Sequence, residues 1–305
     1  MTPNLSSAHT EILTHALDIA AKTGFTPEQI AEIAPAAEKI LANAPDGFAA
    51  LEKAVLEQRE NTGMIHSLTR PLGLEDDFGM LVCSLLLTRA SHDLYRERGI
   101  DEEIYLASMR DIWVWAKTCL DNRHHLGLYE YGWIRNFLTA YIVRLGRLEF
   151  HIITYDLDEP YSACGVTVKK GDPVINTHIP ADGPLNPEDV EDAFRRAYRY
   201  FNKSGITPIV CHSWLLYPEN RLFCAPESRI VSFLNCFDIV ESEDSPNSGD
   251  LWRVFGCRDS YEPDTLPEKT PLQRQLKAHL QSGGTMGAGY GILLHDGEKR
   301  VREET

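Results

Sequence analysis

The stretch PVINTHIPADGPLNPEDVEDAFRRAYRYFNK, residues 173–203, predicts a strand, a short loop rich in glycine and proline, and a helix. The strand is expected over 174–179, where most residues are apolar or β-branched. Asn186 is placed to cap the helix by accepting a hydrogen bond from a free N–H group of the first turn. Pro187 then suits the first helical position, so the helix is expected to begin there.

The loop before this helix is a candidate anion site. A strand that leads into a helix through such a loop directs unpaired N–H groups and the positive end of the helix dipole at one spot. The pyrophosphate of a nucleotide or coenzyme binds at spots of this kind, which makes Gly183, Leu185 and Asn186 candidate coenzyme-binding residues. The alternative is an ordinary connection between strand and helix, and Glu188 and Asp189 favour it because acids in the first turn repel an anion.

Size and charge restrict the class of protein. A chain of 305 residues suits two domains or one large one. The formal net charge of −15 argues against nucleic acid or an anionic membrane as the main partner, because both attract a basic surface. The 7 cysteines include no C-x-x-C pair, which indicates reduced thiols in the cytoplasm rather than a disulfide framework or a zinc site. Neither a signal peptide nor a membrane span is expected.

The two parts of the chain differ in periodicity, and together they predict an α+β protein. Residues 1–125 follow the helical period throughout, and Thr26 with Gln29 forms a capping box. Residues 126–305 alternate strands and helices, which predicts a mixed α/β domain. Strands are expected in this second part over 147–155, 174–179, 208–214, 237–241, 251–256 and 290–294. Helices are expected between them over 133–142, 187–201, 227–235 and 272–281.

Three ionisable residues alternate along one of these strands. Side chains of a strand point to opposite faces in turn, so Arg147, Glu149 and His151 are expected to share one face. Such a face meets either water or a functional site, and both interpretations stay open. If it is a site, the three residues are expected to face a cleft.

A second polar group ends the strand expected over 208–214. His212 and Trp214 lie on one face of this strand, and Ser213 lies on the other. His212 can act as a general base, and Ser213 can donate a hydrogen bond to a carbonyl group. A core histidine bonded to a backbone carbonyl is the alternative. His178 ends the strand before the Gly183 loop, so a short crossover would place it beside His212 at the same end of the sheet, lining the main pocket.

Other chemistries have weaker support. His151, His178, His212 and Glu149 could bind a metal by residue type, although their spacing matches no known ligand motif. The glycines at 287, 289 and 291 precede a strand rather than open a helix, so the dinucleotide interpretation fails.

The order of elements from the 174–179 strand onward resembles the second half of the GNAT N-acyltransferase fold. The particular strings resemble a bacterial group of proteins with an all-helical N-terminal acyltransferase domain, here 1–125, and a GNAT-like C-terminal domain, here 126–305. The resemblance rests on five strings: Trp133-Ile-Arg135, Leu145-Gly-Arg147-Leu-Glu149-Phe, His178-Ile-Pro180-x-x-Gly183-Pro184-Leu185, Cys211-His212-Ser213-Trp214-Leu-Leu and Arg253-Val-Phe. The pyrophosphate signature Gln/Arg-x-x-Gly-x-Gly/Ala of GNAT enzymes is replaced here by the loop 180–186.

This resemblance implies transfer of an acyl group from acyl-CoA to an amine. It implies a small-molecule acceptor and acyl-CoA as a co-substrate rather than a permanently bound cofactor, with no metal. His212 is the first candidate for the general base, with His178 and Glu149 as alternatives. The residues expected to contact substrate are Arg147, His151, Ser213 and Trp214.

Two other functions remain open at this point. A non-catalytic GNAT-like module would bind a small molecule or a protein partner, and a metal-dependent hydrolase would use the histidines as ligands. The oligomeric state is open as well, with a homodimer among the options.

Overall fold

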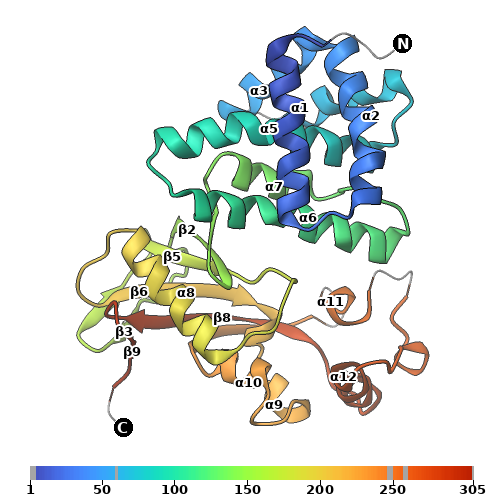
Figure 1. The fold of residues 1–305 in the computed structure, drawn as a ribbon. Coiled ribbons are helices and arrows are strands. Elements are labelled where there is room, and N and C mark those ends of the chain that lie inside the picture. The colour runs from blue at the N-terminus through green and yellow to red at the C-terminus, as the bar shows by residue number, and fades with distance from the viewer. Residues whose placement is uncertain (1–4, 59–60, 246–249, 257–259, 304–305) are drawn as a thin grey trace. The chain divides into compact units, whose positions relative to one another are not determined.

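The computed structural model describes residues 5–58, 61–245, 250–256 and 260–303. The chain divides into two compact units, Met1–Arg144 and Leu145–Thr305 (Figure 1). The division falls later than the boundary at 125 given above, because the helix Tyr131–Leu138 packs against the two long helices of the first unit. The predicted α+β class is confirmed.

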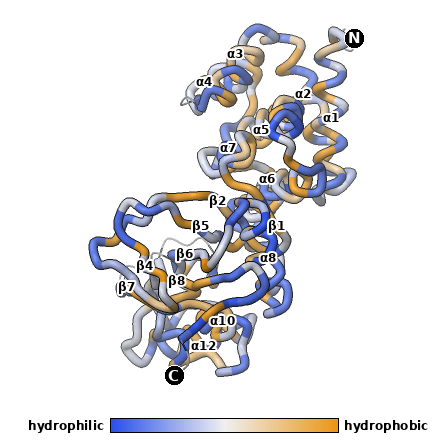
Figure 2. Tube along the Cα trace, turned by 90° about the vertical axis from the view of Figure 1, so that its left-hand side faces the viewer, coloured by the Kyte–Doolittle hydropathy of each residue, from blue (hydrophilic) through white to orange (hydrophobic). Residues whose placement is uncertain are grey.

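The first unit is helical, as the 3.6-residue periodicity predicts. Its helices are α1 (Ser7–Thr23), α2 (Pro27–Asn43), α3 (Pro45–Leu56), α4 (Thr62–Thr69), the 3-10 turn η1 (Arg70–Leu72), α5 (Asp76–Glu97), α6 (Glu102–Arg123) and α7 (Tyr131–Leu138). The capping box of Thr26 and Gln29 is present at the start of α2. Polar and apolar residues alternate along the traces of α1 and α2 (Figure 2), so each helix turns an apolar side to the core.

The second unit is built on a mixed sheet. Its strands are β1 (Val143–Leu145), β2 (Leu148–Thr154), β3 (Tyr161–Ala163), β4 (Val166–Val168), β5 (Pro173–His178), β6 (Thr207–Ser213), β7 (Asp238–Asp244), β8 (Gly287–His295) and β9 (Arg300–Val301). Its helices and 3-10 turns are α8 (Pro187–Tyr200), η2 (Trp214–Leu216), α9 (Asn220–Phe223), α10 (Arg229–Leu234), α11 (Trp252–Phe255), η3 (Pro263–Thr265) and α12 (Pro271–Gln281).

The strand order of the main sheet is β1-β2-β5-β6-β8-β7, with β9 beside β8, and β3 pairs with β4 in a separate hairpin. The pair β5–β6 is parallel and is joined through α8, whereas β2–β5, β6–β8 and β7–β8 are antiparallel. The parallel ladder is short: it pairs Ile175 with Ile209 and Asn176 with Val210. The carboxyl ends of β5 and β6 therefore extend beyond their ladder.

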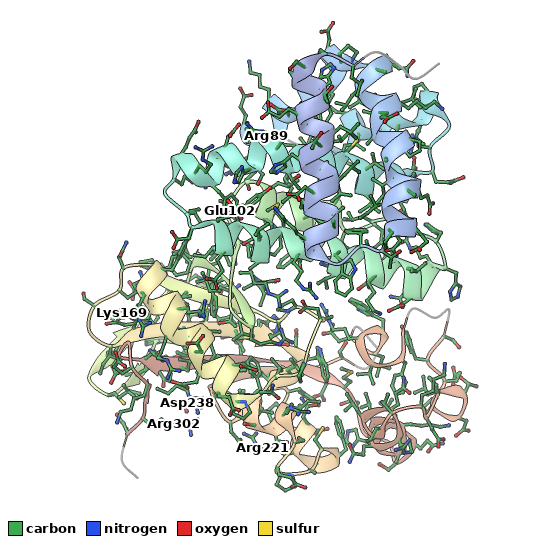
Figure 3. The ribbon with its side chains drawn as sticks, in the orientation of Figure 1. Arg89, Glu102, Lys169, Arg221, Asp238 and Arg302 are labelled. Atoms are coloured by element: carbon green, nitrogen blue, oxygen red, sulfur yellow. The ribbon has the colours of Figure 1, made fainter. Side chains whose placement is uncertain are left out.

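The two faces of this sheet pack against different elements. On one face Phe150 of β2 contacts Phe194 of α8, with ring centroids 6.2 Å apart, and Figure 1 shows α8 lying across the sheet. On the other face the β3–β4 hairpin covers an apolar cluster of Tyr155, Val168, Val174, Val210 and Ile292. A hydrogen bond of 2.5 Å from the Tyr161 hydroxyl to Asp238 of β7, labelled in Figure 3, ties the hairpin to the sheet edge.

One strand expectation is wrong. Residues 251–256 were expected as a strand, and the structure forms the short helix α11 there. Leu251 and Phe255 are four residues apart, a helical spacing, and both pack with Leu266, Leu276 and Met286. A short apolar run does not distinguish a helix from a strand, so the residues that pack against the run determine which of the two forms. The β3–β4 hairpin was not predicted, because three-residue strands give too short a pattern.

The alternate glycines of β8 allow a close approach of backbone. A Cβ atom at Gly289 would lie 2.3 Å from the Leu216 carbonyl oxygen of η2, and one at Gly287 would lie 2.2 Å from the Glu243 carbonyl oxygen. These glycines are therefore packing positions within β8, where the neighbouring backbone leaves no room for a side chain.

The six cysteines within the described residues are all free thiols, and Cys257 lies outside those residues. In the part of the chain that the structure describes, none of the helices has the length and apolar character needed to cross a membrane.

Candidate functional site

A row of polar side chains crosses the hairpin-covered face of the sheet. Strand pairing sets Glu149 of β2 opposite His178 of β5, and His212 of β6 opposite Tyr290 of β8. His178 lies two residues after Asn176 in β5 and His212 lies two residues after Val210 in β6, so both follow the last pair of the parallel ladder. The prediction that these histidines lie at the same end of adjacent strands is confirmed. Glu149 and His178 thus form one cross-strand pair and His212 and Tyr290 form another, on four neighbouring strands of the same sheet.

His151 joins this row from the next level of β2. It lies opposite Asn176, whose Nδ2 is 3.0 Å from the Nε2 atoms of both His151 and His178. The two Nε2 atoms are 3.1 Å apart. An amide NH2 group can donate one hydrogen bond to the Nε2 lone pair of each ring. This assignment places the proton of each neutral ring on Nδ1. Asn176 therefore fixes the orientation of the two imidazoles.

Burial makes both of these histidines poor proton carriers. It lowers the pKa of His178 from 6.5 to about 3, with a smaller contribution from the neighbouring His151. Burial also lowers the pKa of His151 from 6.5 to about 4. Both rings are consequently neutral at neutral pH, and each is a weaker base than a free imidazole.

His212 and Tyr290 form the more open part of the row. The His212 side chain is exposed, and its ring centroid lies 6.1 Å from that of Tyr290. The Tyr290 hydroxyl is buried, and among the described residues it has no hydrogen-bond partner. Burial raises the pKa of this phenol, so it stays protonated and can donate a hydrogen bond to a ligand.

Glu149 is nearly inaccessible, with 1% of its surface exposed. It shares its sheet face with His151, as the strand alternation predicts. Arg147 precedes β2, and its guanidinium instead donates hydrogen bonds to the carbonyl oxygens of Pro180, Gly183 and Pro184. Arg147 therefore holds the loop between β5 and α8.

The start of α8 differs in detail from the prediction. Asn186 occupies the N-cap position, but its side chain makes no capping hydrogen bond, so that part of the prediction is wrong. Its Nδ2 donates to Asp189 Oδ2 at 2.9 Å, and its Oδ1 accepts a hydrogen bond from Arg229 Nε at 2.9 Å. The backbone N–H groups at the start of α8 thus receive no hydrogen bond from Asn186 Oδ1, which is bound instead to the guanidinium of Arg229.

The remaining candidates lie around this end of the sheet. Leu185 is buried and Gly183 belongs to the loop held by Arg147. Ser213 Oγ accepts a hydrogen bond from Leu215 N, so it caps the turn η2 that Trp214 begins. Trp214 packs partly buried against the cluster around Leu276.

Two described hollows lie elsewhere. One runs along α1 and α5 of the helical unit and is lined in part by Glu11, His15 and Arg89, the last labelled in Figure 3. The other lies between α8 and β9, beside Arg195 and Arg300. Neither includes the two strand-end histidines, so the expectation that they line the main pocket is not met by these hollows.

The metal interpretation of the histidines fails on geometry. Among the described residues, His151, His178, His212 and Glu149 do not bring three ligand atoms within 4.8 Å of one another.

Three residues of the site were missed by sequence reasoning. Asn176 was hidden inside a strand, Tyr290 lies between two glycines of β8, and Arg229 approaches the loop from α10. The alternation of β5 could have identified Asn176, because it shares the face of His178. Nothing local indicates Arg229, whose partner lies 43 residues away.

Comparison with known families identifies the chain. Residues 15–140 match the sequence model of the N-acyltransferase N-terminal domain, and residues 142–293 match that of the GNAT-like C-terminal domain. Together the two matches span most of the chain. The chain therefore belongs to the family of proteins that join these two domains.

Solved structures of acyltransferases share its fold. One, in complex with decanoyl-CoA and teicoplanin, is 21% identical with a TM-score of 0.68, covering 91% of this chain and 86% of that chain. Another, in complex with decanoyl-CoA, is 18% identical with a TM-score of 0.70 and the same coverage of 91% and 86%. A mutant acyltransferase in complex with octanoyl-CoA is 18% identical with a TM-score of 0.67, covering 95% and 88%. The search of curated proteins found no match.

Proposed function

We propose that this protein transfers an acyl group from acyl-CoA to the amine of a small molecule. The polar row of Glu149, His178, His212 and Tyr290, which lies on the hairpin-covered face where the parallel strands β5 and β6 end, is the observation that carries the proposal. Membership of the N-acyltransferase and GNAT-like families supports it, as do fold relatives that bind decanoyl-CoA and octanoyl-CoA. The reaction breaks the thioester C–S bond and forms an amide C–N bond.

The coenzyme is proposed to bind where β5 and β6 extend beyond their ladder and α8 begins. Backbone N–H groups of the loop and the first turn of α8 would face the pyrophosphate. Gly183, Leu185 and Asn186 remain the proposed contacts, and Arg229 adds a cation beside Asn186. Arg147 acts indirectly, because its three hydrogen bonds hold the loop in shape.

The proton of the amine is proposed to leave through His178. When the nitrogen attacks the carbonyl carbon, it becomes strongly acidic, so even a weakly basic imidazole can take its proton. The proton would go to Nε2 of His178, which would give up its hydrogen bond from Asn176. Asn176 and His151 hold the His178 ring, whereas the exposed His212 lacks comparable support. We therefore place His178 before His212 as the base, with Glu149 third, which reverses the order of the first two given by the sequence.

Tyr290 is proposed to protonate or hydrogen-bond the departing thiolate. Its phenol stays protonated because burial raises its pKa, and it lies in the same row as the proposed base. His151, Ser213 and Trp214 are proposed to contact the acceptor. The cytoplasm remains the proposed location, in keeping with the free thiols of the described cysteines.

The experiment is acyl transfer by the full chain from acetyl-, octanoyl- and decanoyl-CoA to a panel of amines, with release of free thiol as the readout. We expect turnover with at least one donor and formation of the amide. Stabilisation by CoA without turnover of any donor would favour the alternative, a GNAT-like binding module. A ligand at 100 times its dissociation constant adds about 2.7 kcal/mol of stability, which a thermal melt detects.

A further inference from the structure

A second group of reactive side chains lies in the helical unit, separate from the polar row. It joins the start of α5 to the end of α6 and the loop that follows, through Asp77, Cys119 and His125. Their ligand atoms lie within 4.8 Å of one another. One carboxylate, one thiol and one imidazole are three of the groups that bind Zn²⁺ in proteins.

The distances between these atoms fit one metal ion. Cys119 Sγ lies 3.8 Å from His125 Nε2 and 3.9 Å from Asp77 Oδ2, and the last two atoms are 3.1 Å apart. Tetrahedral zinc with ordinary bond lengths separates such ligands by roughly 3.4 to 3.6 Å. Shifts of a few tenths of an ångström would bring all three onto one ion.

The His125 ring is oriented as a ligand. Its Nδ1 lies 3.1 Å from the carbonyl oxygen of Arg123, and a hydrogen bond there requires the proton on Nδ1. Nε2 then directs its lone pair toward the thiol and the carboxylate. A backbone carbonyl that holds the second nitrogen is the usual support of a metal-bound histidine.

The backbone around the cluster is held closely. Leu128 N donates to Asp77 O at 2.8 Å, and a Cβ atom at position 127 would lie 2.7 Å from Asp77 Cβ. Gly127 therefore allows the loop to press against the start of α5. Cys119 is fully buried, whereas His125 is about half exposed, so an ion can enter from the solvent side.

We propose that Asp77, Cys119 and His125 form a Zn²⁺ site in the helical unit. The thiol binds as a thiolate and releases its proton to water, while His125 supplies the Nε2 lone pair and Asp77 a carboxylate oxygen. Water or the second Asp77 oxygen takes the fourth position. The ion fastens the loop after α6 to the start of α5.

Arg123 competes with the metal. Its guanidinium lies 2.6 Å from Asp77 Oδ2 and stacks over the Tyr129 ring at 4.1 Å. Zinc must displace this cation or share the carboxylate with it. Removing the charge in Arg123→Gln should therefore tighten zinc binding by several-fold.

The test titrates the chelator-treated full chain with Zn²⁺ against a chromophoric competitor. We expect one ion per chain, with affinity at least about 10-fold lower in Cys119→Ser and His125→Ala. His125→Ala changes an exposed side chain, so it stays informative if the buried Cys119→Ser variant does not fold. Co²⁺ in place of zinc should show a thiolate charge-transfer band that Cys119→Ser lacks.

Three matched variants guard against binding elsewhere. His124→Asn changes the exposed neighbour of His125, Cys164→Ser changes a cysteine outside the cluster, and His178→Gln alters the buried imidazole pair. All three should keep the wild-type affinity for zinc. Equal zinc affinities of wild type and His125→Ala, or a loss in His178→Gln as large as in His125→Ala, would overturn the proposal and leave an ion-pair cluster in its place.

Discussion

The two ends of the hairpin-covered sheet face differ in the kind of side chain that they carry. At one end Val174, Val210 and Ile292 are buried with Tyr155 under the β3–β4 hairpin. Toward the other end, the same strands carry the polar row of Glu149, His178, His212 and Tyr290. Between the two ends, Val210 and Ile292 share a level with Asn176 and His151. An apolar end is what hydrophobic packing favours, because burying such side chains stabilises the fold.

The polar end costs stability rather than adding to it. Glu149 and His178 lose hydration there, and the same burial lowers the pKa of His178. A chain selected for stability alone would fill these positions with apolar side chains. The contrast therefore assigns stability to one end of the sheet face and chemistry to the other, and each prediction below tests that division.

The largest expected effect is on activity in His178→Ala. Loss of the proposed base should lower acyl transfer by about 10²- to 10⁴-fold with little change in stability. His212→Ala is the matched control, at the same end of the adjacent strand, and should lose less activity. A variant of His178 with full activity, combined with a large loss in His212→Ala, would return the role of base to His212.

The opposite result is expected at the apolar end. Ile292→Ala leaves a cavity beneath the hairpin and should lower the free energy of unfolding by about 2–5 kcal/mol. Its kcat/KM, measured well below the melting temperature, should stay close to that of the wild type. Denaturant unfolding and steady-state kinetics on one preparation check both statements. A large loss of kcat/KM in the folded variant would mean that the two ends are not separable.

Acid should destabilise the polar end. The pKa values of His178 and His151 are lowered from 6.5 to about 3 and about 4, so between these values and 6.5 the unfolded chain binds more protons. Proton binding therefore leaves the free energy of unfolding unchanged above pH 6.5 and lowers it as the pH falls from 6.5 toward the folded-state pKa values. The double variant His151→Gln/His178→Gln should show a shallower fall of unfolding free energy over this range. Identical slopes would contradict the burial argument.

The smallest expected effect concerns the loop before α8. Arg147→Lys cannot make the three hydrogen bonds of the guanidinium, so the loop should loosen and KM for acyl-CoA should rise by roughly 10-fold. Because Arg147 does not belong to the proposed chemistry, kcat should change less. Arg196→Lys is a control on the outer side of α8, where the arginine pairs with Asp192. A fall in kcat alone would instead place Arg147 at the reacting groups.

The parts of this fold that the sequence predicts are those specified by residues close together in the chain. The caps of α2 and α12 lie within four residues of each helix start, so they are readable without tertiary contacts. The helix α11 depends on packing with Leu276 and Met286, which follow later in the chain, and was predicted wrongly as a strand.

The same limit applies to the site. Alternation along β2 predicts that Glu149 and His151 share a face, and a short crossover predicts that His178 and His212 lie at the same end of adjacent strands. The contact between Asn176 and His151 spans 25 residues and depends on strand register, which no local pattern fixes. The cluster of Asp77 with Cys119 spans 42 residues and two helices, so its ligands show no motif spacing.

The division between the two ends of the sheet face is tested most directly by one parallel measurement. Wild type, His178→Ala and Ile292→Ala are assayed for kcat/KM with acyl-CoA at a temperature where all three are folded, with circular dichroism of the same samples as the check on folding. The account predicts that His178→Ala is folded and loses at least about 100-fold in kcat/KM, while Ile292→Ala keeps its activity. Equal losses in the two variants, or a greater loss in Ile292→Ala, would contradict it.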